Sequence, residues 1–219
     1  MNALELLTLA RGPLFQWALV LCAFGIVLRF VEIYGLGRKA DLSPRRSVSP
    51  GSGWRTMLSR SLPPQGMVRR EPVTYIAGYV FHFGLLFAIL LFQPHIELIR
   101  DLTGIGWTGL PSAIVDALTV AGIAALLVLL AHRLNNPVKR LLSGPGDFVA
   151  WTVTLLPLLT GYLAVHHLFL DYTLMLAVHV LSVNLLLAVL PFTKLFHTFA
   201  VFPSRWFNGD IAGRKGVAS

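Results

Sequence analysis

Five long apolar runs constrain the fold of this chain more than any other feature of its sequence. They occupy residues 14–34, 75–93, 114–132, 148–168 and 172–192. Each run approaches the roughly 20 apolar residues with which a helix crosses a bilayer, and none shows the alternation of a membrane β-strand. Because backbone polar groups in lipid must be bonded within their own segment, such runs predict helices. We expect an all-α integral membrane protein, in which residues 1–219 form a single membrane domain built as a bundle of five transmembrane helices.

The composition agrees with this class. Hydrophobic residues make up 55% of the chain and charged residues only 13%, and the mean hydropathy is +0.70. These values exclude a soluble globular domain. The first run has no basic segment before it and no small-residue cleavage site after it, so we expect a retained helix and not a removed secretory signal.

The positions of the basic residues predict the topology. All of the 18 Lys and Arg residues except Arg11 and Arg100 belong to one side of the five runs, in or beside the loops 35–72 and 133–147 and the tail 198–219. The positive-inside rule then places the N-terminus outside and the C-terminus in the cytoplasm. The net charge of +8 is therefore topological. Since the polar segments do not interleave aromatic with basic residues, we expect no nucleic-acid partner.

The basic cytoplasmic loop 35–72 is the only long polar segment, and it is rich in Ser, Pro, Gly and Arg. Trp54, Met57 and Leu58 predict a short interfacial helix within it. Two interpretations stay open for this loop: a basic linker held near anionic membrane lipid, or a docking surface for a soluble subunit.

Seven histidines and one cysteine define the available metal chemistry. A lone Cys22 within the first run cannot build an iron–sulfur cluster or a c-type haem site in this chain, so a redox metal must be held by histidines. His179 and His197 are eighteen residues, or five helical turns, apart, which would direct both rings from one helix face roughly 27 Å apart. His82 and His95 are thirteen residues, or roughly 20 Å, apart on the second helix.

Two haem b groups, each with two axial imidazoles from facing helices, suit this spacing. We pair His82 with His197 near the cytoplasm and His95 with His179 near the outside. Helix bends at the neighbouring prolines, Pro94 and Pro191, would absorb the difference in spacing. The outer pair has an alternative, because His166 or His167 has a similar depth and could replace His95. At the end of the third helix, His132 is expected only to meet water or headgroups.

With FHFGLLF around His82 and PFTKLFH ending at His197, the chain resembles the gamma subunit of respiratory nitrate reductase and related di-haem cytochrome b membrane subunits. The resemblance covers most of the chain and implies that His82, His179 and His197 are haem ligands. It places the fourth ligand about three residues before His95, where this chain has Phe92. The segments QPHIELI and TGYLAVHHLFL resemble instead relatives in heterodisulfide-reductase-like and sulfur-metabolising complexes, which have cytoplasmic iron–sulfur subunits.

We therefore expect a di-haem b membrane subunit of a respiratory redox complex in a bacterial or archaeal cytoplasmic (inner) membrane. It would pass electrons between the quinone pool and a cytoplasmic iron–sulfur subunit, and would not act alone on the terminal substrate. Candidates for the quinone site, chosen for hydrogen bonding and proton exchange near the outer haem, are His166, His167, Asp171 and Tyr172. Candidates for contacts with haem propionates are Arg29, Arg133 and Lys194.

Three other classes use some of the same features. A proton-coupled transporter component would employ buried histidines, but should also show intramembrane carboxylates, broken helices or repeats. A histidine-based membrane hydrolase or oxygenase would cluster its ligands at one depth. A non-redox membrane anchor for a soluble complex would explain the basic loops and leave the histidines without a role.

Overall fold

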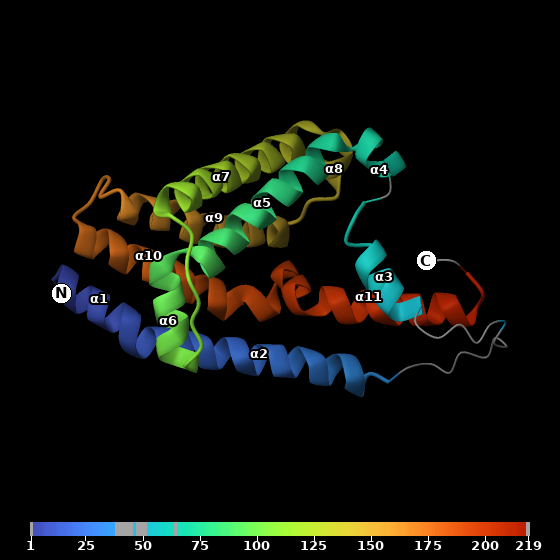
Figure 1. The fold of residues 1–219 in the computed structure, drawn as a ribbon, viewed down its shortest axis with the longest axis horizontal. Coiled ribbons are helices and arrows are strands. Elements are labelled where there is room, and N and C mark those ends of the chain that lie inside the picture. Colours follow the sequence, from blue (N-terminus) through green and yellow to red (C-terminus); the bar gives the residue numbers. More distant parts are fainter. Residues whose placement is uncertain (1, 38–45, 47–51, 64, 218–219) are drawn as a thin grey trace.

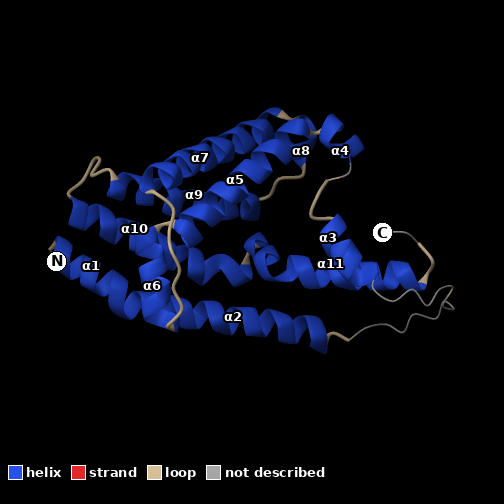
Figure 2. Cartoon of the chain, viewed as in Figure 1, coloured by secondary structure: helices blue, strands red, loops and turns tan. Residues whose placement is uncertain are grey.

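The computed structural model describes residues 2–37, 46, 52–63 and 65–217, and within these ranges every regular element is a helix (Figure 2). Five helices are long and apolar enough to cross a membrane, namely Ala3–Gly35, Pro72–Leu91, Ser112–Asn135, Pro145–Val165 and Tyr172–Phe192. They match the predicted runs to within a few residues, except that the first helix already begins at Ala3. The all-helical class and the five candidate membrane spans are therefore confirmed.

The first helix is longer than predicted and contains an irregular turn. It consists of α1 (Ala3–Leu9), the π-helical turn η1 (Ala10–Leu14) and α2 (Phe15–Gly35). Pro13 has no backbone N–H to donate, so the regular hydrogen-bond ladder is interrupted in this turn. The carbonyl of Ala10 accepts a hydrogen bond of 3.0 Å from Nδ2 of Asn184, which fastens the turn to the fifth helix.

Small residues set the closest helix contact of the bundle, between α5 (Pro72–Leu91) and α7 (Ser112–Asn135). A Cβ on Gly84 would lie 2.5 Å from the carbonyl oxygen of Leu118 and 3.0 Å from Cα of Gly122. The two backbones therefore meet directly, as is common between membrane helices. α9 (Pro145–Val165) packs on α7 and on α10 (Tyr172–Val189), and α10 also packs on α1 and α2 (Figure 1).

A helix replaces most of the loop predicted after the second span. α6 (Gln93–Thr103) follows α5 with only Phe92, in extended conformation, between them, and it lies across the bundle (Figure 1). Ile96 is fully buried in α6, whereas Glu97 and Arg100 on its other sides are exposed. α6 ends at Gly104, whose positive φ of 76° suits glycine as a helix stop. The sequence did not predict this helix because, at eleven residues, it is too short and too polar to be a membrane span.

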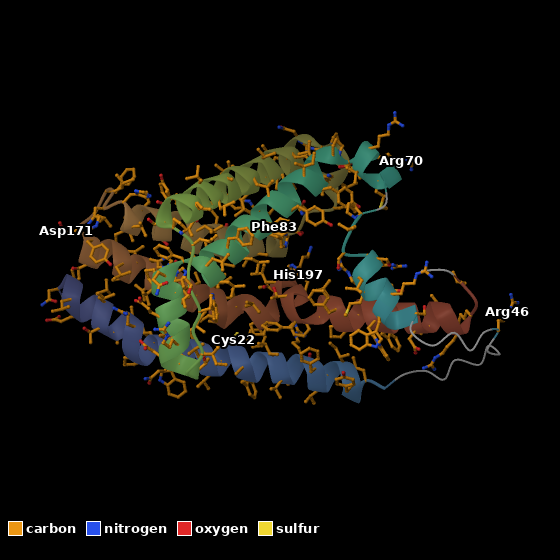
Figure 3. All side chains as sticks on the ribbon, in the orientation of Figure 1. Cys22, Arg46, Arg70, Phe83, Asp171 and His197 are labelled. Carbon is orange, nitrogen blue, oxygen red and sulfur yellow. The ribbon has the colours of Figure 1, made fainter. Side chains whose placement is uncertain are left out.

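The two ends of the bundle differ in structure. We call the end that carries α3 (Ser52–Ser59), α4 (Gln65–Arg70), α8 (Pro137–Leu141) and α11 (His197–Arg214) the basic end. The other end, with the start of α1 and the turn before α10, is the N-terminal end. Figure 3 shows Arg46 and Arg70 at the basic end and Asp171 at the N-terminal end. The helix predicted around Trp54 is present as α3, while the segment expected to be a plain tail, 198–219, is largely the helix α11.

α3 and α11 pack as closely as α5 and α7 do. A Cβ on Gly53 would lie 2.8 Å from Nε1 of Trp206, and one on Gly209 would overlap Thr56. Ser52 Oγ donates to the carbonyl of Gly209 at 2.6 Å. The loop between the first two spans is therefore fastened to the C-terminal helix by contacts that require small residues.

The fifth span is interrupted before His197, which corrects the prediction of one continuous helix through both histidines. α10 ends at Val189 and is followed by the 3-10 turns η2 (Leu190–Phe192) and η3 (Lys194–Phe196). Thr193, between these turns, is extended with φ −118° and ψ −179°. Pro191 cannot donate to the preceding helical turn, which explains a break at the bend that the sequence predicts there. The shared-face argument for His179 and His197 therefore does not hold.

The α5–α7 contact predicts the effect of adding a methyl group at two glycines of one helix. Gly84→Ala should destabilise the detergent-solubilised protein by about 1–3 kcal/mol, because the new Cβ meets the backbone of α7. Gly78→Ala is the control, since a Cβ there has nothing within 4 Å. Unfolding in a denaturing detergent series measures both, and equal stability of the two variants would contradict the packing argument.

Candidate functional site

Four histidine rings face each other in two pairs. The ring centres of His82 on α5 and His197 at the start of α11 are 6.2 Å apart, with the ring planes at 76°. The ring centres of His95 on α6 and His179 on α10 are 6.1 Å apart, and these rings are stacked at 25°. The structure thus brings together the two pairs that the sequence predicts. We call them the inner pair, nearer the basic end, and the outer pair.

Hydrogen bonds fix the same ring nitrogen in each of the four histidines. Nδ1 of His82 lies 2.7 Å from the carbonyl of Gly78, Nδ1 of His197 lies 2.8 Å from that of Lys194, and Nδ1 of His95 lies 2.7 Å from that of Ala88. A carbonyl only accepts, so these Nδ1 atoms must carry the proton. The arrangement leaves Nε2 of each ring as a lone-pair donor, which is the form in which histidine binds metals.

His179 is oriented by a side chain and a small neighbour on α9. Its Nδ1 lies 3.3 Å from Oγ1 of Thr160, whose own hydrogen is donated to the carbonyl of Leu156 at 2.7 Å. Gly161 follows, and a Cβ there would come within 3.0 Å of the His179 ring. Thr160 and Gly161 were not identified from the sequence, because a threonine and a glycine inside an apolar run give no signal until the facing helix is known.

The two pairs differ in their surroundings. His82 and His197 are exposed in the chain, whereas His95 and His179 are half-buried. Burial lowers the pKa of His95, so this imidazole is held in the neutral form that a metal requires. The edge of the His95 ring packs against Phe92 with ring centres 5.4 Å apart, and the extended Phe92 turns the chain so that His95 reaches the bundle interior.

The spacing of each pair fits two axial ligands of one iron. With metal–nitrogen bonds of about 2 Å and a ring centre about 1 Å behind each nitrogen, two axial imidazoles have centres about 6 Å apart. Both observed separations, 6.2 and 6.1 Å, have this value. Among the described residues, no group of three or more His, Cys, Asp or Glu side chains is arranged to hold a metal ion.

The three basic propionate candidates all have protein partners at the basic end. Arg29 Nε donates to the carbonyl of Pro191 at 3.1 Å, and its Nη1 lies 2.9 Å from a carboxylate oxygen of Glu32. Lys194 Nζ lies 2.7 and 2.8 Å from the two carboxylate oxygens of Asp147. Arg133 Nη1 is 3.4 Å from the same carboxylate and donates to Ser143.

The quinone candidates gather at the N-terminal end, in the turn between α9 and α10. The His166 ring contacts that of Tyr162, with ring centres 4.3 Å apart and the planes tilted at 45°, and its Nε2 lies 3.4 Å from a carboxylate oxygen of Asp116. His167 stacks on Tyr172 at 4.9 Å. Their partners explain why neither His166 nor His167 takes the place of His95 opposite His179. Asp116 was missed in the sequence, although a single carboxylate early in an apolar run was a visible signal.

The turn itself has an unusual backbone. His167 and Phe169 have positive φ values of 53° and 68°, which residues with side chains rarely adopt. Asp171 follows as the residue before α10. Leu168 and Leu170 close the turn through a backbone hydrogen bond of 2.9 Å. The turn therefore places its aromatic and ionisable side chains at the N-terminal end of the bundle, where they are exposed.

His132 has a structural partner, in line with the limited role predicted for it. Its Nε2 accepts from Nζ of Lys139 at 2.8 Å, and the same Nζ lies 2.6 Å from a carboxylate oxygen of Glu71. This cluster joins the start of α5 to α8 at the basic end. The Lys139 ammonium holds the pKa of Glu71 below its ordinary value.

A protein of Nitratidesulfovibrio vulgaris (strain Hildenborough) is 31% identical to this chain over 216 residues, which cover 95% of the chain and 94% of that relative. The chain belongs to the same family as this protein, which is described only as "Protein". No family model matches the chain, and no solved structure does.

The Glu71 cluster predicts a pH-dependent contribution to stability. A carboxyl whose pKa is lowered on folding stabilises the protein above its unfolded pKa, here near 4.5, and loses that contribution as the pH falls through the folded value. Glu71→Gln should therefore lower the melting temperature slightly at pH 7, by about 1–3 °C, since exposed ion pairs contribute little. The difference from wild type should close below pH 4. An undiminished difference at pH 3 would contradict the ion-pair assignment.

Proposed function

We propose that this chain is a di-haem b membrane subunit that exchanges electrons between a quinone pool and a cytoplasmic iron–sulfur protein in a respiratory redox complex. The observation that carries the proposal is the pair of facing imidazoles at each of two levels, with ring centres 6.1–6.2 Å apart. Nδ1 of three of the four rings is bonded to a backbone carbonyl, and that of the fourth to Thr160.

Haem b would supply reversible one-electron chemistry at each level. The histidines that would hold each haem come from α5 and α11 in the inner pair, and from α6 and α10 in the outer pair. Apolar helices exclude water around them, and Phe81 and Phe92 pack against the edges of two of the four rings. The family resemblance of the sequence points to three of the same ligands. It would place the fourth ligand at position 92, where this chain has Phe92, whereas in the structure the ring opposite His179 is that of His95.

A quinol site beside the outer pair is supported by the turn between α9 and α10. Oxidation of a quinol releases protons as well as electrons, so the site needs a base with access to water. His166 is partly exposed, and its Nε2 lies beside the carboxylate of Asp116. With Nε2–H directed to that carboxylate, Nδ1 is the ring atom that can accept a proton from a quinol hydroxyl. Asp116 would stabilise the imidazolium formed, as a carboxylate does in other imidazole bases.

The basic end supports the proposed cytoplasmic side and partner. The positive-inside rule assigns this end to the cytoplasm, and α11 leads from the inner ligand His197 directly to the surface formed with α3. On α3 and the turn after it, Trp54, Leu58 and Leu62 are 63, 71 and 73% exposed. Arg55 and Arg60, both exposed, belong to the same segment, so its chemistry fits an electron-transfer protein with an acidic rim. We place the complex in a bacterial or archaeal cytoplasmic membrane.

The haem assignment predicts which substitutions act together. The purified wild-type chain should contain about two b haems, and His82→Ala or His197→Ala should each remove the same one, because a bis-imidazole site loses its iron when either ring is missing. His95→Ala and His179→Ala should remove the other. Reduced-minus-oxidised optical spectra with haem quantified per chain measure this loss.

His132→Ala is the matched control, since His132 contacts only Lys139 and Glu71 at the surface and should leave both haems in place. A folded wild-type chain without haem would overturn the proposed function in favour of an anchor or transporter. Retention of two haems in His95→Ala, with loss of one in His166→Ala or His167→Ala, would instead overturn the outer pairing.

The quinol site predicts a kinetic effect of the Asp116–His166 pair. In proteoliposomes a short-chain quinol should reduce the haems of the wild-type chain, and His166→Phe should slow this reduction about a hundredfold or more, because proton transfer to a placed base is lost. Phenylalanine keeps the ring contact with Tyr162. The total haem reduced by dithionite should not change. His132→Phe, at the opposite end, should reduce at the wild-type rate, and an equal rate in His166→Phe would place the quinol elsewhere.

A further inference from the structure

The segment that presents the inner ligand His197 is the least regular backbone among the helices of the bundle. It comprises the turns η2 and η3, residues 190–196, with Thr193 extended between them. Such 3-10 turns have poorer hydrogen-bond geometry than an α-helix and persist only in short pieces. His82, by contrast, is held by a regular helix, with its Nδ1 bonded to the carbonyl four residues earlier. The position of His197 therefore depends on what holds this segment, which we call the ligand turn.

α9 holds one side of the ligand turn through Asp147. The Asp147 side chain is only 10% exposed, and both of its carboxylate oxygens contact Nζ of Lys194. The same carboxylate accepts from the backbone N–H of Gly144 at 3.0 Å, which fixes it at the start of α9. Arg133 on α7 places a second cation 3.4 Å from the same carboxylate. Asp147 is thus a rigid attachment point, and Lys194 is the residue of the ligand turn that it binds.

α2 holds the opposite side of the ligand turn through Gly25 and Arg29. A Cβ on Gly25 would lie 2.6 Å from the Pro191 ring, so only glycine allows the turn to approach α2. One helical turn later, Arg29 Nε donates to the carbonyl of Pro191, which the interrupted helix leaves without its usual partner. Phe30 packs edge-on against Phe196, with ring centres 5.5 Å apart.

A hydrogen bond of the imidazole connects these contacts to the ligand. The carbonyl of Lys194 accepts from Nδ1–H of His197 at 2.8 Å, so the residue whose side chain binds Asp147 also sets the orientation of the imidazole by its backbone. A shift of Lys194 moves the acceptor of this bond. The three other histidine rings are bonded to residues of α5 or α9.

We propose that Asp147 is a positioning residue for the inner haem ligand: through Lys194, and opposite Arg29, it holds the ligand turn so that His197 faces His82. The effect on a haem rests on the proposed function. The contacts of Asp147 with Lys194 and of Arg29 with Pro191, which together we call the brace, are properties of the fold. The brace also gives Lys194 and Arg29 a role different from binding haem propionates. In a propionate role Lys194 would act alone, whereas in the brace Lys194 and Asp147 act as a unit.

The test compares Asp147→Asn, Lys194→Met and the double variant in the full chain. The first readout is amide hydrogen exchange over residues 190–198, which requires no haem, and exchange there should accelerate at least tenfold in each variant. The second readout is the haem content of each variant and its low-temperature electron paramagnetic resonance spectrum, both compared with those of the wild-type chain. The inner-haem signal should broaden or fall below half of the wild-type signal in both single variants, and the outer-haem signal should not change. The loss of inner-haem signal in the double variant should be no larger than in either single variant.

Lys194→Met leaves the start of α9 intact, so it keeps the test decisive if Asp147→Asn fails to fold. Asp147→Glu should restore most of the wild-type inner signal, because it keeps the charge. Glu71→Gln is the matched control, since it removes a lysine–carboxylate pair at the same end that does not touch the ligand turn. An effect of Lys194→Met on the inner haem without any effect of Asp147→Asn would overturn the brace in favour of a propionate contact.

Unchanged exchange at residues 190–198 in both single variants would also overturn it. A wild-type chain without haem would refute the proposed function and not the brace, because the hydrogen-exchange arm still reports on the ligand turn. The two failures are therefore distinguishable.

Discussion

The hydrogen bond between each imidazole Nδ1–H and an oxygen of the chain is the interaction on which the candidate site depends. A histidine inside an apolar bundle must satisfy its N–H or pay the cost of burying it unbonded. Of the two half-buried rings, His95 has the carbonyl of Ala88 and His179 has Thr160, and the exposed His82 and His197 are likewise bonded to backbone carbonyls. One interaction therefore fixes the tautomer, the ring orientation and the direction of Nε2. Any function of the four rings has to begin from that geometry.

Two of the four histidine rings are positioned by regular helices and two by breaks between helices. His82 and His179 lie within uninterrupted helices, while His95 and His197 each follow a break, at Phe92 and at residues 190–196. A continuous second and fifth helix would need matched spacings, and 13 and 18 residues do not match. The breaks remove that requirement, because each displaced segment can be placed by its own contacts. The break at residues 190–196 also leaves the carbonyl of Pro191 without its usual helical partner, and Arg29 Nε donates to it.

The sequence was sufficient to predict five helices long and apolar enough to cross a membrane, and which histidine rings lie opposite each other, because length, apolar character and depth in a membrane are one-dimensional properties. It could not predict α6, which lies across the bundle and has no span-like composition. It predicted a bend at Pro191, but not the two 3-10 turns that follow Val189, whose contacts with Gly25 and Asp147 come from helices distant in sequence. Asp116 and Thr160 were missed for the same reason: a polar residue in an apolar run acquires its meaning only from the facing helix.

Helix α5 shows how small residues divide the bundle into closed and open contacts. On one face, Gly84 lets α5 meet α7 backbone to backbone, so no side chain fits between the two helices there. On another face, His82 is exposed and faces His197 across 6.2 Å between ring centres. A helix fixed so closely to α7 has little freedom to move toward α11. The distance between the His82 and His197 rings is therefore determined on the α5 side by glycine packing and on the α11 side by the ligand turn. Mutations that change this distance should act through the ligand turn.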